Sequence, residues 1–426
     1  MGNASSTEDT SEAFVIASKK FSESELRDLK KLFVSLAYQS KSGGKYVIAS
    51  VFQAYFGIHG SLGGRLFNLI TQERENMCLY YEDLVIAKGL YEKGAPDEVE
   101  NFMYQLVDLS GDGHTQRAEV EGVILSILQT VLGPSNAVTG AGLSEGSLQS
   151  FLQAASFTED VEGEAAPCMS LEDFRKWCAS VPSIKKFLTS LLKGPAPGLP
   201  GRLVPELLMP DKMGQLQPVM RKEYAWHLAG VMQSQEAVQW VLVYHSSAHG
   251  LSFNTFLGKL AIVQGPSVLV VKDKQGCVYG GYASQPWEKH SDFYGDMKSF
   301  LFTLHPKAAI YRPTGKNTNL QWCAANFSSE SIPNGVGFGG QVHHFGLFIN
   351  AAFEGGHTRH SVTYNNPPLS SQSNILPDVV ECWAVVVKTD DNTSNGASGL
   401  QGTVLERFKE DRQMLNMVGI AGASMD

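Results

Sequence analysis

The hydrophobic pattern of this chain changes at a proline- and glycine-rich segment, KGPAPGLPG, which begins at Lys193. Apolar residues before it have the spacing of amphipathic helices, whereas later runs such as WVLVYH from Trp240 are typical of strands. Proline and glycine interrupt both kinds of element, so the segment predicts a linker. With 426 residues, the chain has room for two or three domains. The sequence predicts a multidomain α + β protein, with a helical domain followed by a sheet sandwich that has helices packed at its edge. Helical stretches are expected around Leu203–Met209 and Tyr224–Met232, before the strands.

The helical half contains a twelve-residue segment, DLSGDGHTQRAE, which runs from Asp108 to Glu119. Oxygen-bearing side chains stand at its positions 1, 3 and 5, a glycine at position 6 and a glutamate at position 12, as in a calcium-binding loop. Helix-like patterns precede and follow it. We expect one calcium ion, with these ligands: Asp108, Ser110, Asp112, the main-chain carbonyl of His114, and Glu119.

A second interpretation of this loop stays open. Only three of the predicted ligands are acids, and Thr115 stands where a branched apolar residue usually joins such a loop to its neighbour. Under this interpretation the loop serves helix packing and binds calcium too weakly to be filled in a cell.

Three other segments have the length or the flanks of a calcium loop but lack its ligands. Gln39–Ser50 contains no acid, and Gln72–Asp83 carries Arg74 at its third position. A stretched fourth segment ends at Asp173 and contains Pro167. One loop in four is therefore predicted to be competent.

This pattern, with the start MGN, resembles the EF-hand domains of the calcineurin B and neuronal calcium sensor group across about residues 20–190. The resemblance implies a domain that regulates partners and performs no chemistry. The first residues, MGNASS, also predict N-myristoylation of Gly2 once Met1 is removed, because Ser6 occupies the favoured position. A single myristoyl chain binds membranes only marginally, so a second anchor, a protein partner, is expected.

Composition excludes several classes of function. The net charge is −9, nearly all of it before Lys193, and no basic stripe is present to bind nucleic acid. No apolar run approaches the roughly 20 residues that a membrane span needs. The six cysteines are widely spaced, which predicts reduced thiols in the cytosol.

The second half offers only weak signals for a cofactor or a metal. Gly335–Gly340 reads GVGFGG, the spacing of a dinucleotide loop, but an alternating run follows it where a helix is required, so it predicts a glycine-rich turn that leads into a strand. The adjacent His343 and His344 would point to opposite faces of a strand, which argues against a shared metal. Cys277 and Cys323 are predicted to be packing residues, with redox thiols as the alternative.

Several motifs of this half together resemble the TLDc domain across about residues 203–388. They are WVLVYHSSAHG from Trp240, FNTF from Phe253, GGY from Gly280 with Trp287, YGDMKSFLF from Tyr294, GVGFGG from Gly335 and ECWAVV from Glu381. The resemblance implies a two-sheet antiparallel β-sandwich with flanking helices and no established catalytic site. It also implies a link to protection from oxidative stress and to the lysosomal V-ATPase. A TLDc domain behind an EF-hand-like lobe is similar to mTOR-associated members of the family, which implies lysosomal membrane association and support of mTOR signalling.

The last segment of the chain predicts an amphipathic helix at residues 403–418. Thr403 and Glu406 have the spacing of a capping box, and Gly419 ends the pattern. Such a helix either docks on its own domain or inserts into a partner groove, and we favour the partner. Its predicted contact residues are Val404, Leu405, Phe408, Leu415 and Val418.

These observations predict the following segments: a flexible, myristoylated N-terminus at 1–19, an EF-hand-like domain at 20–192, a linker at 193–202, a TLDc domain at 203–388, a linker at 389–402, the helix at 403–418 and a tail at 419–426. The leading hypothesis is a non-enzymatic adaptor on the cytoplasmic face of the lysosomal membrane and in the cytoplasm, with the V-ATPase and mTOR pathway components as partners implied by the resemblance. Two alternatives are a calcineurin B-like calcium sensor and a peroxide-handling protein that uses Cys277 or Cys323.

Overall fold

The computed structural model describes residues 11–72, 74–133, 145–158, 166–196, 198–210, 213 and 216–387. The chain divides into two compact units. The helical unit comprises the residues up to Val204 together with Glu223–Val231 and Leu304–Ala309, and the sheet unit comprises the rest. Gly2 and the predicted helix at 403–418 lie outside the described residues.

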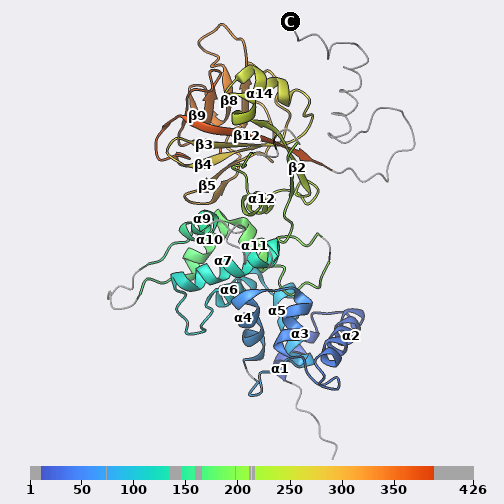
Figure 1. The fold of residues 1–426 in the computed structure, drawn as a ribbon. Coiled ribbons are helices and arrows are strands. Elements are labelled where there is room, and N and C mark those ends of the chain that lie inside the picture. Colours follow the sequence, from blue (N-terminus) through green and yellow to red (C-terminus); the bar gives the residue numbers. More distant parts are fainter. Residues whose placement is uncertain are drawn as a thin grey trace, which may run out of the picture. The chain divides into compact units, whose positions relative to one another are not determined.

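The helical unit is a succession of short helices joined by loops (Figure 1). Local capping explains several helix starts: Ser22 and Glu25 form a capping box on α2, as Ser170 and Asp173 do on α10. The helices are α1 (Glu12–Ser18), α2 (Glu23–Gln39), α3 (Ala49–Phe56), α4 (Gly60–Thr71), α5 (Tyr81–Lys93), α6 (Pro96–Val107), α7 (Arg117–Leu132), α9 (Glu145–Gln153), α10 (Leu171–Ser180), α11 (Pro182–Leu188) and α12 (Lys222–Ala229).

Helix α1 lies inside the segment that the sequence predicted to be flexible. Ser11 caps its first turn, and Ala17 is buried in a small apolar cluster with Leu29 and Val85. The added Cβ of any residue at Gly89 would lie 3.2 Å from the Cβ of Ala17, which shows how closely α1 approaches α5. This packing orders a segment whose own periodicity is too short to predict a helix.

The loops of the helical unit are joined in pairs. We call the α2–α3, α4–α5, α6–α7 and α9–α10 connections the first, second, third and fourth loops. Val47 of the first loop and Leu79 of the second exchange two main-chain hydrogen bonds of 2.9 and 3.0 Å. In the other pair, the N–H of Met169 donates to the carbonyl of Thr115 at 2.8 Å. Two helix–loop–helix segments are thereby coupled in each half of the unit.

In the first loop, the residue that pairs with the second loop lies one position later than the sequence register predicts. Val47 is the residue of the first loop that pairs, and it lies three residues after Gly44, whereas Thr115 lies two after Gly113. The sequence register of Gln39–Ser50 fits the glycine but places Tyr46 at the pairing position. One extra residue between the turn and the pairing position accounts for the difference.

Helix α12 packs in the helical unit, although it follows the linker in sequence. Trp226 is 1% exposed and packs edge-on against Phe151 of α9. His227 Nδ1 lies 3.2 Å from the Ser183 hydroxyl of α11, and complete burial lowers the pKa of His227 to about 3. The helical core therefore includes residues that the sequence assigned to the second domain at 203–388.

The sheet unit contains two sheets, as the sequence predicted (Figure 1). The seven-stranded sheet has the order β1 (Glu206–Leu208), β2 (Gln239–His245), β12 (Pro377–Val386), β3 (Ser267–Asp273), β4 (Val278–Ala283), β5 (Phe300–His305) and β6 (Ala309–Tyr311). The five-stranded sheet has the order β11 (Asn374–Ile375), β10 (Gly356–Thr358), β9 (His344–Asn350), β8 (Gly335–Gln341) and β7 (Gln321–Ala324). Two short helices, α13 (Ser246–His249) and α14 (Phe253–Leu260), follow β2.

Strand β1 corrects two expectations. The sequence predicted a helix around residues 203–209, but Glu206–Leu208 pairs with β2. The pairing is parallel, so the sheet is not wholly antiparallel. A three-residue strand carries almost no periodic signal, and pairing with β2 decides its conformation.

The glycine-rich segment GVGFGG is strand β8 itself, where the sequence predicted a turn that leads into a strand. The turn comes later, at His343, whose φ is +64°. A Cβ at Gly337 would lie 2.7 Å from the carbonyl oxygen of Leu347 on β9. Glycine is thus required here by close backbone packing and not by a turn or a phosphate.

Across the sandwich, Phe338 of β8 covers Gly281 of β4. A Cβ at Gly281 would lie 2.6 Å from the ring of Phe338, which belongs to the main apolar core. Phe256 of α14 belongs to the same core, so this helix packs against the sheets. Among the described residues, no helix is both long and apolar enough to cross a membrane.

Candidate functional site

The third loop, which the sequence predicts to bind calcium, connects α6 to α7. Pro96 occupies the first turn of α6, and Gln116 is the N-cap of α7. Gly111 and Gly113 have φ values of +81° and +88°, a conformation that side-chain-bearing residues rarely adopt. These two glycines let the chain turn back within the length of the loop.

The predicted ligands of this loop turn toward its own main-chain N–H groups. Asp108 Oδ1 accepts from Gly111 N at 2.7 Å, and its Oδ2 accepts from Gly113 N at 3.0 Å. Glu119 Oε1 accepts from Ser110 N at 2.7 Å. The first and the last predicted ligands therefore close the loop through the backbone.

The donor set of the third loop fits calcium. Carboxylate, hydroxyl and main-chain carbonyl oxygens are the ligands that this hard cation prefers. Within the described ranges, no group of three or more His, Cys, Asp or Glu residues is gathered as a metal cluster, and Asp108, Asp112 and Glu119 accept main-chain hydrogen bonds. Calcium would supply a divalent charge that draws these side chains together.

The second loop contains an internal cation. Arg74 donates to Asp83 through Nε, at 3.0 and 3.2 Å to the two carboxylate oxygens, and through Nη2 at 2.8 Å. The hydrogen bonds to Asp83 are the main reason that the pKa of Arg74 is raised. Asp83 occupies the position that Glu119 has in the third loop. The sequence showed Arg74 only as a missing ligand, whereas the structure shows its guanidinium bound to the carboxylate at the end of the loop.

Hydroxyl groups bond the backbone of the first loop and the residues that end the fourth loop at the start of α10. The Ser42 hydroxyl donates to the carbonyl of Tyr46 at 2.6 Å and accepts from the N–H of Lys45. In the fourth loop, the Ser170 hydroxyl donates to Asp173 Oδ2 at 2.6 Å, and this bond lowers the pKa of Asp173. In the described parts of the first, second and fourth loops, protein groups thus bond one another where a calcium loop would use the ion.

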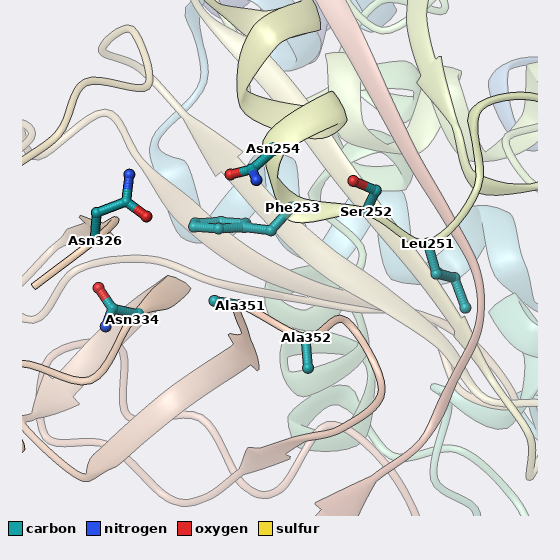
Figure 2. A pocket seen from close by; sticks show the side chains of 8 residues that line it. All are labelled: Leu251, Ser252, Phe253, Asn254, Asn326, Asn334, Ala351 and Ala352. Carbon is teal, nitrogen blue, oxygen red and sulfur yellow. The ribbon is translucent and has the colours of Figure 1, made fainter.

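A pocket of about 380 Å³ opens in the sheet unit at the N-terminus of α14. Figure 2 shows the carboxamides of Asn254, Asn326 and Asn334 grouped around one end of the Phe253 ring. Asn334 is held by Phe327, whose N–H and carbonyl it pairs with at 2.9 and 2.8 Å. The carboxamides of Asn254 and Asn326, with no charged residue among the lining residues, suit a neutral polar group.

Comparison with known families matches residues 214–386 to the TLDc domain. These residues form a TLDc domain. The structure adds that α12, although it lies inside the matched range, packs in the helical unit.

The chain is similar to proteins that contain this domain. It is 32% identical over 257 residues to the MTOR-associated protein MEAK7 of Mus musculus, covering 58% of this chain and 54% of that protein. It is 28% identical over 312 residues to the Danio rerio protein of the same name, covering 71% and 68% respectively. Over 179 residues it is 27% identical to Oxidation resistance protein 1 of Rattus norvegicus, covering 42% of this chain and 19% of that protein. The chain thus spans about half the length of the mouse relative.

The TLDc domain buries a carboxyl group that sequence reasoning did not single out. The side chain of Glu381 on β12 is 1% exposed and accepts from Met220 N at 3.1 Å, from Trp383 Nε1 at 2.9 Å, and from Val219 N. His245 Nε2 lies 3.4 Å from its Oε1 without hydrogen-bond alignment. Burial raises the pKa of Glu381 and lowers that of His245, so burial disfavours the charged form of each group.

The thiols proposed for peroxide chemistry are buried in the core of the TLDc domain. Cys277 is 7% exposed and Cys323 is 1% exposed. Burial raises the pKa of the Cys323 thiol to about 12, whereas a reactive cysteine needs a thiolate at neutral pH. We expect Cys323 to react with a thiol-specific reagent such as Ellman's reagent only after denaturation, while the half-exposed Cys78 and Cys168 react in the native protein. Mass spectrometry of the labelled protein checks this, and rapid native labelling of Cys323 would contradict the packing.

Proposed function

We propose that this protein is a non-enzymatic adaptor that associates with the cytoplasmic face of lysosomal membranes and supports mTOR signalling. The observation that carries the proposal is the similarity to proteins named MTOR-associated protein MEAK7, which extends over 71% of this chain in the Danio rerio comparison. The V-ATPase is the proposed membrane partner, an expectation that comes from the TLDc family resemblance. Myristoylation of Gly2 would supply part of the membrane affinity.

We also propose that calcium at the third loop adjusts this association. The loop contains the oxygen donors of a calcium site, and its second helix, α7, packs in the same unit as α4 and α9. The helix predicted at 403–418 is the proposed second contact with the partner, through Val404, Leu405, Phe408, Leu415 and Val418.

An antioxidant role is a weaker candidate. It is favoured by the similarity to Oxidation resistance protein 1, whose name describes a protective effect. A direct thiol reaction is disfavoured by the burial of Cys277 and Cys323. Protection through a partner remains compatible with an adaptor.

In the decisive experiment the protein is immobilised, and an extract of detergent-solubilised lysosomal membranes is passed over it, once with calcium and once with a chelator. We expect V-ATPase subunits to be retained, and retention to differ between the two conditions. The double variant Asp108→Ala, Glu119→Ala removes the first and last predicted ligands, so its retention should be the same in both. The control Asp97→Ala, Glu121→Ala removes two acids from the flanking helices α6 and α7 and should retain the calcium dependence.

Two outcomes count against the proposal. Absence of V-ATPase subunits in both conditions removes the proposed partner. Calcium dependence that survives in the Asp108→Ala, Glu119→Ala variant removes the third loop as its cause. The simple sensor alternative cannot be tested by deleting residues 203–426, because the deletion would take Trp226 of α12 out of the helical core. A Phe408→Asp variant tests it instead: an adaptor that uses the terminal helix loses retention, and a sensor keeps its partner.

A further inference from the structure

The guanidinium of Arg65 lies against the third loop, although Arg65 belongs to α4 at the start of the second loop's helix pair. Its Nη2 is 3.7 Å from Asp108 Oδ2, and the two side chains are only 15% and 10% exposed. Its Nε donates to the carbonyl of Gln105 at 3.1 Å, in the last turn of α6. A full positive charge therefore stands beside the first predicted calcium ligand.

The main chain of the loop is fitted closely to this guanidinium. A Cβ at Gly111 would lie 2.6 Å from Arg65 Nη1, closer than any side chain could approach without a shift. Gly111 N also donates to Asp108 Oδ1, so Gly111 lies beside both the Asp108 carboxylate and the Arg65 guanidinium. Arg65, Asp108 and Gly111 form one packed contact.

Helix α4 is attached to both helices that flank the third loop. Arg65 bonds α6 through Gln105. On the other side, the Ser61 hydroxyl lies 3.2 Å from the Ser126 hydroxyl of α7, and Leu62 N donates to the same Ser126 oxygen at 3.3 Å. Movement of α6 relative to α7 therefore strains or breaks one of these two attachments.

We propose that Arg65 is the counter-charge that closes the third loop in the metal-free protein and lowers its affinity for calcium. The inference rests on the calcium site of the proposed function. A divalent ion held by Asp108 is repelled by Arg65, and screening is weak because both side chains are mostly buried. Calcium that satisfies Asp108 weakens its attraction to Arg65, and so weakens one of the contacts that hold α4 beside α6 and the third loop. Calcium-sensing helix pairs change their angle in this way when the ion binds.

Calcium titration of the full-length protein by calorimetry tests this proposal. Arg65→Gln removes the positive charge that repels calcium. Because the site is poorly screened, the dissociation constant for calcium is expected to fall about tenfold. Arg65→Lys keeps the charge and should bind as the wild type does. Arg27→Gln removes a charge from an exposed position of α2 and should also leave the affinity unchanged.

The outcomes separate the inference from the proposed function. If Glu119→Ala abolishes calcium binding while Arg65→Gln binds no more tightly than the wild type, the counter-charge idea is wrong and the calcium site stands. Equal tightening in Arg65→Lys and Arg65→Gln would assign the effect to the lost bond to Gln105 and would also overturn the idea. If neither the wild type nor Arg65→Gln binds calcium, the calcium part of the proposed function fails and the inference fails with it.

Hydrogen exchange gives a readout that does not depend on affinity. In chelator, Arg65→Gln should speed amide exchange in α4, because its attachment to α6 is lost, and circular dichroism should show that the protein remains folded. Calcium should speed exchange in α4 of the wild type and have little further effect in Arg65→Gln. Exchange in α4 that calcium leaves unchanged in the wild type would contradict the release of Arg65.

Discussion

Replacement of Gly281 by valine is expected to destabilise the TLDc domain by more than about 3 kcal/mol, because the new side chain has no space between the two sheets. A Cβ at this position would lie 2.6 Å from two carbons of the Phe338 ring, and Phe338 is itself fully buried. The ring cannot move away without displacing the rest of the core. Urea denaturation of the full-length protein, followed by near-ultraviolet circular dichroism, measures the loss.

Gly258 provides the matched control in the same domain. It lies within α14, and a Cβ at this position would meet no atom within 4 Å. Gly258→Ala should therefore raise the free energy of unfolding by about 0.5–1 kcal/mol, through the helix propensity of alanine. A Gly281→Val protein that unfolds at the same urea concentration as the wild type would show that β4 and β8 are not packed face to face as described.

Local sequence patterns predict those features of this protein that depend on residues close together in the chain, such as helices, strands and motifs. The change of pattern at Lys193 predicted helices before it and two sheets after it, and both are confirmed. The TLDc motifs predicted a domain that the family comparison confirms. The calcium ligands of Asp108–Glu119 stay a prediction, which spacing alone allows because all of them lie in one loop.

Features that depend on distant residues could not be predicted in this way. Glycine at Gly337 looks like a turn residue in the sequence, and only the approach of Leu347 shows that it is needed within a strand. Arg65 and Asp108 are far apart in the chain, so no spacing rule joins them. The calcium-loop motif describes only oxygen ligands, so in the sequence Arg74 is simply a missing ligand. The motif cannot show that its guanidinium bonds the Asp83 carboxylate in place of an ion.

Replacement of the buried Glu381 is the other change with a large expected effect. Glu381→Leu leaves three N–H donors, from Val219, Met220 and Trp383, without an acceptor in the core, which should cost at least about 3 kcal/mol of unfolding free energy. Glu288→Leu is the control, because the side chain of Glu288 is 70% exposed. Its effect should remain within about 0.5 kcal/mol in the same urea measurement.

The neutral variant Glu381→Gln tests the protonation state of this carboxyl group. Burial raises the pKa of Glu381 above the ordinary value of 4.5 more than its three N–H donors lower it. A raised folded-state pKa contributes stability that is fully present below pH 4.5 and is lost as the pH rises through the folded value. The wild type should therefore gain stability relative to Glu381→Gln as the pH falls from 7 toward about 4.5, when the two proteins are compared by urea denaturation at each pH. The opposite trend would mean that the N–H donors and His245 stabilise an ionised Glu381 more than burial disfavours it.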